Sequence, residues 1–147
     1  MPLVYNDDYR FNLGKAVTMR PGAEVTIIAI GIMVAAALEA ADNLKREGID
    51  CCVLNMSTLK PLDETIIIKA AADTGAIVTA EEHLEHGGLG SSVARVVAKY
   101  HPVPMEFVAI KDTYAESGKA AELLQRYGLT AKDIEKAVRS VIKRKNG

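Results

Sequence analysis

Residues 25–54, VTIIAIGIMVAAALEAADNLKREGIDCCVL, decide the fold because two strand patterns flank a helix pattern. The apolar runs at 25–30 and 50–54 predict short strands. Between these runs, apolar residues recur every three to four positions: Val34, Leu38, Ala41 and Leu44. This spacing predicts an amphipathic helix, and Gly48 is a natural residue to end it. A strand, a helix and a second strand in this order predict two parallel strands of one sheet.

The alternation of strands and helices continues to the end of the chain. We expect further strands over 76–80 and 103–110, and further helices over 63–75, 89–100, 117–127 and 131–145. Thr130 and Asp133 form a capping-box pattern before the last helix, whose final basic residues, 143–145, we expect to be solvated. Helices of crossover length between short apolar strands require a mostly parallel sheet with helices on both faces. The sequence therefore predicts a three-layer α/β/α fold.

A Pro-Gly turn at residues 20–23 precedes the deciding stretch and connects two β-prone runs, 15–19 and 25–30. Two such runs on either side of a short turn predict an antiparallel hairpin, so we expect the hairpin to add one antiparallel edge strand to the sheet. Residues 1–14 have no periodic pattern. We therefore expect an N-terminal arm over 1–14 and a single domain over 15–147.

Composition argues against several classes of partner. The chain has 147 residues, 18 Lys and Arg against 19 Asp and Glu, and a net charge of −1, so its bulk charge does not attract nucleic acid or an anionic membrane. No apolar segment is long enough to span a bilayer and the acidic N-terminus is not a signal sequence, so we expect a cytoplasmic protein. Cys51 and Cys52 are adjacent within a strand, and their thiols should point to opposite faces rather than form a disulfide or a zinc site.

Ligands of an open α/β sheet bind beyond the carboxyl ends of the strands. Four segments are expected there: 31–32, 55–58, 81–92 and 111–113. The segment 81–92, EEHLEHGGLGSS, is the richest in titratable groups and glycines. The residues of these segments that could contact a partner or bind an anion are Glu81, Glu82, His83, His86, Gly87, Gly88, Gly90, Ser91, Lys111 and Asp112.

A dinucleotide cradle is one interpretation of this loop. Residues 88–93, GLGSSV, match the G-x-G-x-x-G pattern except at Val93, and Asp112 follows about 20 residues later, where the pattern places a ribose-binding acid. The pattern normally occupies the first strand-to-helix turn of its fold, whereas here it occupies a later one. The glycines would still allow backbone N–H groups at the helix start to face an anion. A small-ligand or nucleotide-binding module therefore stays an alternative.

Metal binding and acid–base catalysis are two further interpretations. His83 and His86, with Glu82 or Glu85, could converge on a metal, but no second cluster completes a coordination shell, and two solvated imidazoles are the commoner outcome. His83 could accept a proton from a substrate and is the single catalytic candidate. Glu81 and Glu82 are adjacent in an extended segment, so they cannot face one substrate together. No nucleophile or second base is recognisable in the sequence.

Several motifs of the chain recur in order in one protein family: VTIIAIG (25–31), LKPLD (59–63), EEH (81–83), GGLGS (87–91), and IKDT (110–113) with ESG (116–118). Together they resemble the C-terminal domain of transketolase, particularly the type divided between two polypeptides. The resemblance runs from about Pro2 to the end of the chain. Deoxyxylulose-phosphate synthases and the β-subunits of 2-oxoacid dehydrogenases share this domain and remain alternatives.

The resemblance implies a five-stranded, mostly parallel sheet. It also implies a cytoplasmic, dimeric enzyme of the pentose phosphate pathway, which transfers two-carbon ketol units between sugar phosphates with thiamine diphosphate and Mg²⁺. In that family the cofactor lies between two other domains, where a Gly-Asp-Gly motif holds its diphosphate and a glutamate of the central domain activates it. This sequence contains no Gly-Asp-Gly, so we expect no cofactor-binding or metal-binding residue on this chain.

The resemblance therefore implies an assembly domain that is inactive alone. Its partners would be the N-terminal cofactor-binding domain and the central domain of transketolase, together with a second copy of the assembly. In the loop, Gly87, Gly88 and Gly90 would permit a tight strand-to-helix turn, and Ser91 or Ser92 would cap the helix. Three residues would face the neighbouring domain or subunit: Glu81, Glu82 and His83.

Overall fold

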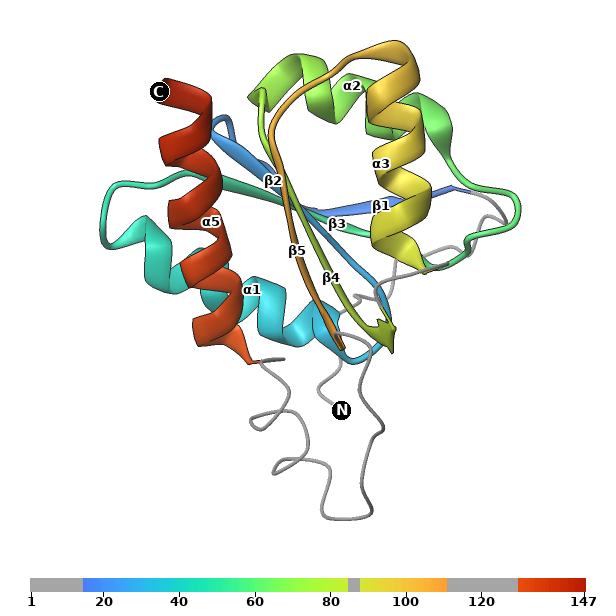
Figure 1. Cartoon of the computed structure of the whole chain (residues 1–147). Helices are drawn as coiled ribbons and strands as arrows, with labels where there is room; N and C mark the ends of the chain where they lie inside the picture. The colour runs from blue at the N-terminus through green and yellow to red at the C-terminus, as the bar shows by residue number, and fades with distance from the viewer. Residues whose placement is uncertain (1–14, 85–87, 111–129) are drawn as a thin grey trace.

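A five-stranded sheet forms the centre of the chain, in the order β1-β3-β2-β4-β5 (Figure 1). The computed structural model describes residues 15–84, 88–110 and 130–147. The strands are β1 (Val17–Arg20), β2 (Val25–Ala29), β3 (Cys51–Asn55), β4 (Ile77–Leu84) and β5 (Met105–Ile110). β2 is parallel to β3 and β4, and β4 is parallel to β5, whereas β1 is antiparallel to β3. The prediction of a mostly parallel sheet with one antiparallel edge strand is confirmed.

Helices cover both faces of this sheet. They are α1 (Met33–Lys45), α2 (Glu64–Thr74), α3 (Leu89–Tyr100) and α5 (Ala131–Asn146). α1 and α5 pack on one face, and α2 and α3 on the other, which confirms the three-layer fold (Figure 1). The expected arm over 1–14 and the expected helix over 117–127 lie outside the described residues. Among the helices that the structure describes, none has the length and apolar content needed to cross a membrane.

The central strands are buried on both faces, so alternate side chains join different apolar clusters. Ile27 packs with α1 and α5, whereas its neighbour Ile28 packs with α2 and α3. Cys51 and Cys52 diverge in the same way, the first into the α1 and α5 cluster and the second against the other. Both thiols are free, as predicted.

The predicted hairpin between the first two strands is wrong. β1 pairs with one side of β3 and β2 with the other, so the connection between them must cross the beginning of β3. It does so at Gly22, where an added Cβ would lie 2.2 Å from the carbonyl carbon of Cys51 and 2.4 Å from the backbone nitrogen of Cys52. The crossing is held by Asp50, whose carboxylate accepts a hydrogen bond from the backbone N–H of Ala23 at 3.0 Å. The Pro-Gly pair therefore permits a close backbone crossing rather than a hairpin turn.

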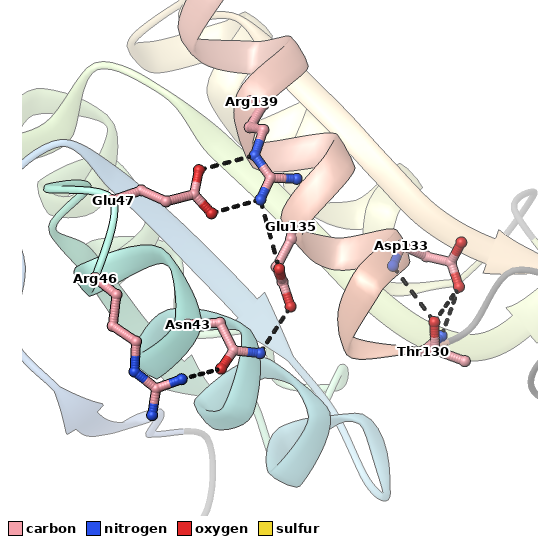
Figure 2. A network of polar contacts seen from close by, with 7 residues as sticks. All are labelled: Asn43, Arg46, Glu47, Thr130, Asp133, Glu135 and Arg139. Carbon is pink, nitrogen blue, oxygen red and sulfur yellow. Dashed lines mark hydrogen bonds and ion pairs between the residues drawn. The ribbon is translucent and has the colours of Figure 1, made fainter.

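Side chains at the helix starts satisfy backbone N–H groups that have no partner within the helix. The predicted capping box of α5 is confirmed: Thr130 Oγ1 accepts from the backbone N–H of Asp133 at 3.4 Å, and the Asp133 carboxylate accepts from that of Thr130 at 2.8 Å (Figure 2). Asp63 caps α2 by accepting from the backbone N–H of Ile66 at 3.3 Å. The same carboxylate accepts from the backbone N–H of Ala16 at 2.9 Å, which attaches the segment before β1 to α2.

Polar side chains also join α1 to α5 (Figure 2). Asn43 donates to Glu135 at 3.0 Å, and Arg139 donates to both oxygens of Glu47, at 3.1 and 2.6 Å. The hydrogen bond from Arg139 holds the pKa of the Glu47 carboxyl below its usual value. Both partners of this ion pair are exposed, and an exposed ion pair contributes little to the free energy of folding. Its main effect is therefore to fix the orientation of α1 relative to α5.

Residues 143–145 are exposed, as expected, and the last turn of α5 also contacts the amino ends of the strands. Arg144 donates to a backbone carbonyl and a carboxylate, and Lys145 donates to two backbone carbonyls at 2.9 and 2.7 Å. The acceptors are Met105, Glu106, Glu24 and Thr74. The terminal basic residues therefore attach α5 to three separate segments of the chain.

Candidate functional site

The carboxyl ends of β2, β3 and β4 lie together at one edge of the sheet. Their register aligns Ala29 of β2 with Asn55 of β3 and with Ala80 of β4. The backbone N–H of Met56 also donates to the carbonyl of Ala29 at 2.9 Å, and that of Ile30 to Ala80 at 3.2 Å. The segments 31–32, 55–58 and 81–82 therefore meet at this edge, as predicted.

Glu81 is buried at this edge, with 1% of its surface exposed. One carboxylate oxygen accepts a hydrogen bond from the backbone N–H of Leu89 at 2.7 Å, and the other from that of Gly90 at 2.6 Å. These are the first amides of α3, which have no partner within the helix, and a negative charge there is also favoured by the helix dipole. Glu81 therefore caps α3 from the neighbouring strand with both of its oxygens.

This cap differs from the arrangement expected for the loop. α3 begins at Leu89, so Ser91 and Ser92 lie in its first turn and not at its N-cap. Glu81 lies inside the domain rather than on an exposed contact surface. The difference arises because β4 continues past Ala80, the expected end of the strand, and thereby directs the Glu81 side chain toward the start of α3.

The same cap bears on the dinucleotide interpretation. A phosphate at a helix N-terminus is bound by free backbone N–H groups. In this chain the amides of Leu89 and Gly90 donate to Glu81, so a phosphate at this position would have to displace a buried carboxylate. The GLGSSV segment therefore forms a closed helix start rather than an open cradle.

Gly90 is required by the close approach of α3 to the sheet. A Cβ added at Gly90 would lie 2.7 Å from Cδ1 of Phe107, 3.0 Å from Oγ1 of Thr79 and 3.3 Å from Oε2 of Glu81. The first distance is shorter than any normal carbon–carbon contact, so a side chain here would push α3 away from β4 and β5. This glycine thus serves packing and the Glu81 cap, and Gly88 directly precedes the helix as its N-cap.

Glu82 lies next to Glu81 and has the opposite environment, because successive strand residues point to opposite sides. Its side chain is exposed, and its Oε1 would lie 3.8 Å from a Cβ added at Gly31. Gly31 has a φ of +64°, a conformation that favours glycine, and it starts the turn from β2 into α1. Ile32, the next residue, leaves 38% of its surface exposed. Gly31, Ile32 and Glu82 therefore form an exposed surface at the carboxyl edge, which we call the edge surface.

Several of the predicted site residues lie outside the described part of the chain: His86, Gly87, Lys111 and Asp112. The backbone of His83 belongs to β4, but its side chain also lies outside what the structure describes. The expectation that His83 and His86 are solvated imidazoles rather than metal ligands stays a prediction, and so does His83 as the single catalytic candidate.

The described residues do not fit the metal-bound diphosphate of thiamine diphosphate. Within 15–84, 88–110 and 130–147, no three His, Cys, Asp or Glu side chains come together as a metal site would need. The buried carboxylate of Glu81 is already bonded to α3. Burial raises the pKa of the Cys51 thiol to about 12, so this thiol stays protonated and unreactive at neutral pH.

A hollow that the sequence did not predict lies between α3 and the loop that leads into α2. It has a volume of about 410 Å³, and its basic lining residues are Lys60, Arg95 and Lys99. The spacing of Arg95 and Lys99 places both on one face of α3 and could have indicated it. Lys60 could not have been assigned to the same site, because its approach to α3 depends on tertiary packing.

Comparison with known proteins identifies a family with this fold. The model of the family "Transketolase, C-terminal domain" matches residues 14–134. A 6-deoxy-6-sulfo-D-fructose transketolase subunit from a Clostridium species is 47% identical over 141 residues, which cover 96% of this chain and 43% of that protein. A 1-deoxy-D-xylulose-5-phosphate synthase from Heliobacterium modesticaldum is 41% identical over 131 residues, which cover 88% of this chain and 20% of the synthase.

Among solved structures, an inactive β4 tetramer of a split-gene transketolase has the same fold. It superposes with a TM-score of 0.94 at 45% sequence identity, and the match covers 98% of this chain and 47% of that one. The chain thus spans about half the length of the split-transketolase subunits that it matches. Because the family model covers most of the chain and the fold agrees, the chain belongs to the transketolase C-terminal domain family.

Proposed function

We propose that this chain is the non-cofactor-binding C-terminal domain of a transketolase, an enzyme that transfers two-carbon ketol units between sugar phosphates. Its role in that enzyme is assembly and contact with the other domains. The observation that carries the proposal is the closed cap at Glu81. The buried carboxylate of the polar loop has both oxygens bonded to α3, so it builds the domain instead of meeting a substrate.

In this proposal, thiamine diphosphate and Mg²⁺ are held by the N-terminal cofactor-binding domain and the central domain. The chain alone is therefore inactive, and catalysis requires those domains. The similarity to a split-gene transketolase whose β4 tetramer is inactive supports this division of labour. We further propose a homodimeric assembly in the cytoplasm and a place in the pentose phosphate pathway, as the family resemblance implies.

The edge surface is the part of the described chain that we assign to contact with those domains. It combines an exposed apolar side chain, Ile32, with an exposed carboxylate, Glu82, at the edge where open α/β sheets meet ligands and partners. An interface usually has an apolar centre and a polar rim, and these two residues supply one element of each.

Reconstitution tests the proposal. The purified chain is mixed with a polypeptide that carries the cofactor-binding and central domains, together with thiamine diphosphate and Mg²⁺. Transfer from xylulose 5-phosphate to ribose 5-phosphate is then followed. We expect no turnover by the chain alone and turnover by the mixture. Turnover by the chain alone would contradict the proposal. Activity of the mixture with pyruvate and glyceraldehyde 3-phosphate instead would favour the deoxyxylulose-phosphate synthase alternative.

A pair of charge reversals tests the edge surface. Glu82→Lys should weaken association with the cofactor-binding polypeptide about tenfold, because it places a cation where the interface has an anion. Glu39→Lys is the matched control, since Glu39 is an exposed glutamate on α1, away from the edge surface.

Calorimetric titration tests the alternative of a self-sufficient ligand-binding module. The chain alone is titrated with thiamine diphosphate, NAD and sugar phosphates. Micromolar binding of any of these would favour a self-sufficient ligand-binding module.

A further inference from the structure

The groove between α3 and the loop before α2 has the size of a small-molecule site. Its volume of about 410 Å³ lies in the range of about 300–1,000 Å³ that ligand pockets occupy. Leu59, Lys60 and Leu62 line it from the loop, and Arg95 and Lys99 line it from the helix. All of these residues belong to the part of the chain that the structure describes. None of them belongs to the edge surface or to the Glu81 cap, so the groove does not depend on the proposed function.

The cations of this groove have no ion-pair or hydrogen-bond partner among the residues that the structure describes. Lys60, Arg95 and Lys99 are exposed, and none of them has an ion pair or a hydrogen bond with another residue that the structure describes. The remaining described arginines each bond to a neighbouring side chain: Arg20, Arg46, Arg139 and Arg144. Among the arginines that the structure describes, Arg95 is therefore the one without such a bond.

The arrangement is unfavourable unless an anion is present. Arg95 and Lys99 are four residues apart on α3, and like charges at this spacing destabilise a helix. Lys60 adds a third positive charge from the opposite wall, against a single carboxylate, Glu64. A dianion bound between the two walls would turn the mutual repulsion of these cations into attraction.

The groove also has an apolar part. Leu59 and Leu62 are half-buried, and Tyr100 has 49% of its surface exposed. The Lys99 ammonium lies 5.1 Å from the centre of the Tyr100 ring, so cation and aromatic face adjoin. A ligand with a carbon skeleton would contact both parts, whereas a bare inorganic anion would use only the charges.

We propose that this groove binds a small organic phosphate. The phosphate group lies between Lys60, Arg95 and Lys99, since a guanidinium matches phosphate oxygens in a fork and ammonium groups complete the charge. The carbon skeleton lies against Leu59, Leu62 and the Tyr100 ring. The start of α3 does not compete for the phosphate, because Glu81 already occupies it.

A titration with phenyl phosphate tests the assignment. The full ¹⁵N-labelled chain is titrated with phenyl phosphate, inorganic phosphate and phenol while its backbone amide shifts are recorded. We expect saturable changes at Lys60, Arg95 and Tyr100 with phenyl phosphate. We expect inorganic phosphate to bind about tenfold more weakly at the same amides, because it lacks the apolar contact, and phenol to leave them unchanged.

Single substitutions then test the charges. Arg95→Gln should raise the Kd for phenyl phosphate about tenfold, since a charged hydrogen bond to the ligand is lost. Arg46→Gln is the matched control, because Arg46 is an exposed arginine on the opposite side of the sheet, and its Kd should be unchanged. Glu64→Gln should lower the Kd severalfold by removing the one repulsive charge of the lining. All three positions are exposed, and unchanged shifts elsewhere will verify that each variant is folded.

Three results would overturn the proposal. The first is no saturable shift at the groove amides up to tens of millimolar phenyl phosphate. The second is an equal effect of Arg95→Gln and Arg46→Gln, which would indicate general charge screening. The third is binding of a hexaglutamate peptide to the same amides at lower concentration than phenyl phosphate, which would assign the groove to an acidic protein segment.

Discussion

At the scale of the residue, Glu81 and Glu82 have the same side chain and different functions. Both were expected to face a partner, but the alternation of strand side chains directs one into the domain and the other into solvent. The buried carboxylate of Glu81 accepts hydrogen bonds from two backbone amides of α3. We therefore assign the Glu81 carboxylate to the stability of α3 rather than to catalysis.

Neutralising Glu81 should destabilise the domain. A hydrogen bond to a charged group contributes about 1.5–3 kcal/mol, and the amide of Glu81→Gln would direct a donor toward a backbone donor, so we expect a loss of about 2 kcal/mol. For a chain of this length the Tm should fall by about 4–8 °C in calorimetry. Glu82→Gln is the matched control, and a change within about 0.5 kcal/mol is expected at this exposed position. Equal losses in the two variants would refute the capping role of Glu81.

Cys51 should make stability depend on alkaline pH. Burial raises the pKa of this thiol from 9.0 to about 12, so the unfolded thiol ionises first as the pH rises. Its contribution to stability is therefore complete below pH 9 and is lost between pH 9 and about 12. At one pH unit above the unfolded pKa this amounts to about 1.4 kcal/mol. Burial also raises the pKa of Cys52, so both thiols contribute to the alkaline loss. Urea unfolding at pH 8 and pH 10 should show the largest loss in the parent chain, and Cys51→Ala should reduce it more than Cys52→Ala does. A slope that Cys51→Ala leaves unchanged would assign the pH dependence to other groups.

At the scale of the element, the position of β1 depends on one residue without a side chain. The connection from β1 to β2 passes over the start of β3 at Gly22, where backbone atoms of Cys51 lie within 2.4 Å of an added Cβ. No rotamer change can relieve a clash with backbone atoms. The antiparallel edge of the sheet is therefore specified by a contact between segments that the sequence pattern treats separately.

Gly22→Ala should detach β1 from the sheet. We expect a loss of more than about 3 kcal/mol or a displaced β1, since the crossing cannot close over a methyl group. Hydrogen exchange should then accelerate in the β1 amides more than in β2 and β4. Gly48→Ala is the control for glycine replacement itself: Gly48 has a φ of +80° with nothing within 4 Å of an added Cβ, so only backbone strain of about 1–2 kcal/mol is expected. Similar exchange profiles in the two variants would contradict the role of the crossing.

These elements also show how much of the fold the sequence predicts. The strands and helices follow from apolar spacing and caps, such as Val34 with Leu38 and Thr130 with Asp133, which are local properties of the chain. Strand order is not local. The Pro-Gly turn predicted a hairpin because turn chemistry alone does not reveal that β3 passes between the two runs.

The site was predicted in part for the same reason. The carboxyl edge was found because parallel strands end together, so residues 31–32 and 81–82 had to be neighbours. The cap by Glu81 was missed because it depends on the length of β4 and on the return of the chain over it. The groove of Lys60 and Arg95 was missed because its walls are distant in sequence.

At the scale of the whole molecule, the two ends of the sheet differ. At the amino ends of the strands, the last turn of α5 bonds to the carbonyls of Glu24, Thr74 and Met105, which closes that end. At the carboxyl ends, the edge surface leaves Ile32 and Glu82 exposed. In the proposed function, the other domains of the enzyme contact this open end, because the exposed residues of the edge surface lie there.

This asymmetry predicts that stability and assembly can be separated. Removing residues 144–147 deletes Arg144 and Lys145 with their four hydrogen bonds to three segments. The loss should be about 3–4 kcal/mol, at about 1 kcal/mol for each bond to a backbone carbonyl and up to about 1 kcal/mol for the exposed pair with Glu106. Removing only 146–147 retains both side chains and is the matched control. Urea unfolding will measure the loss, which should appear as one cooperative transition because the three segments belong to one sheet. Below the transition, the affinity of both truncated chains for the cofactor-binding polypeptide should equal that of the full chain, since the deleted turn lies at the closed end. A loss of affinity that exceeds the loss of folded protein would place part of the interface at α5 and contradict the assignment to the open end.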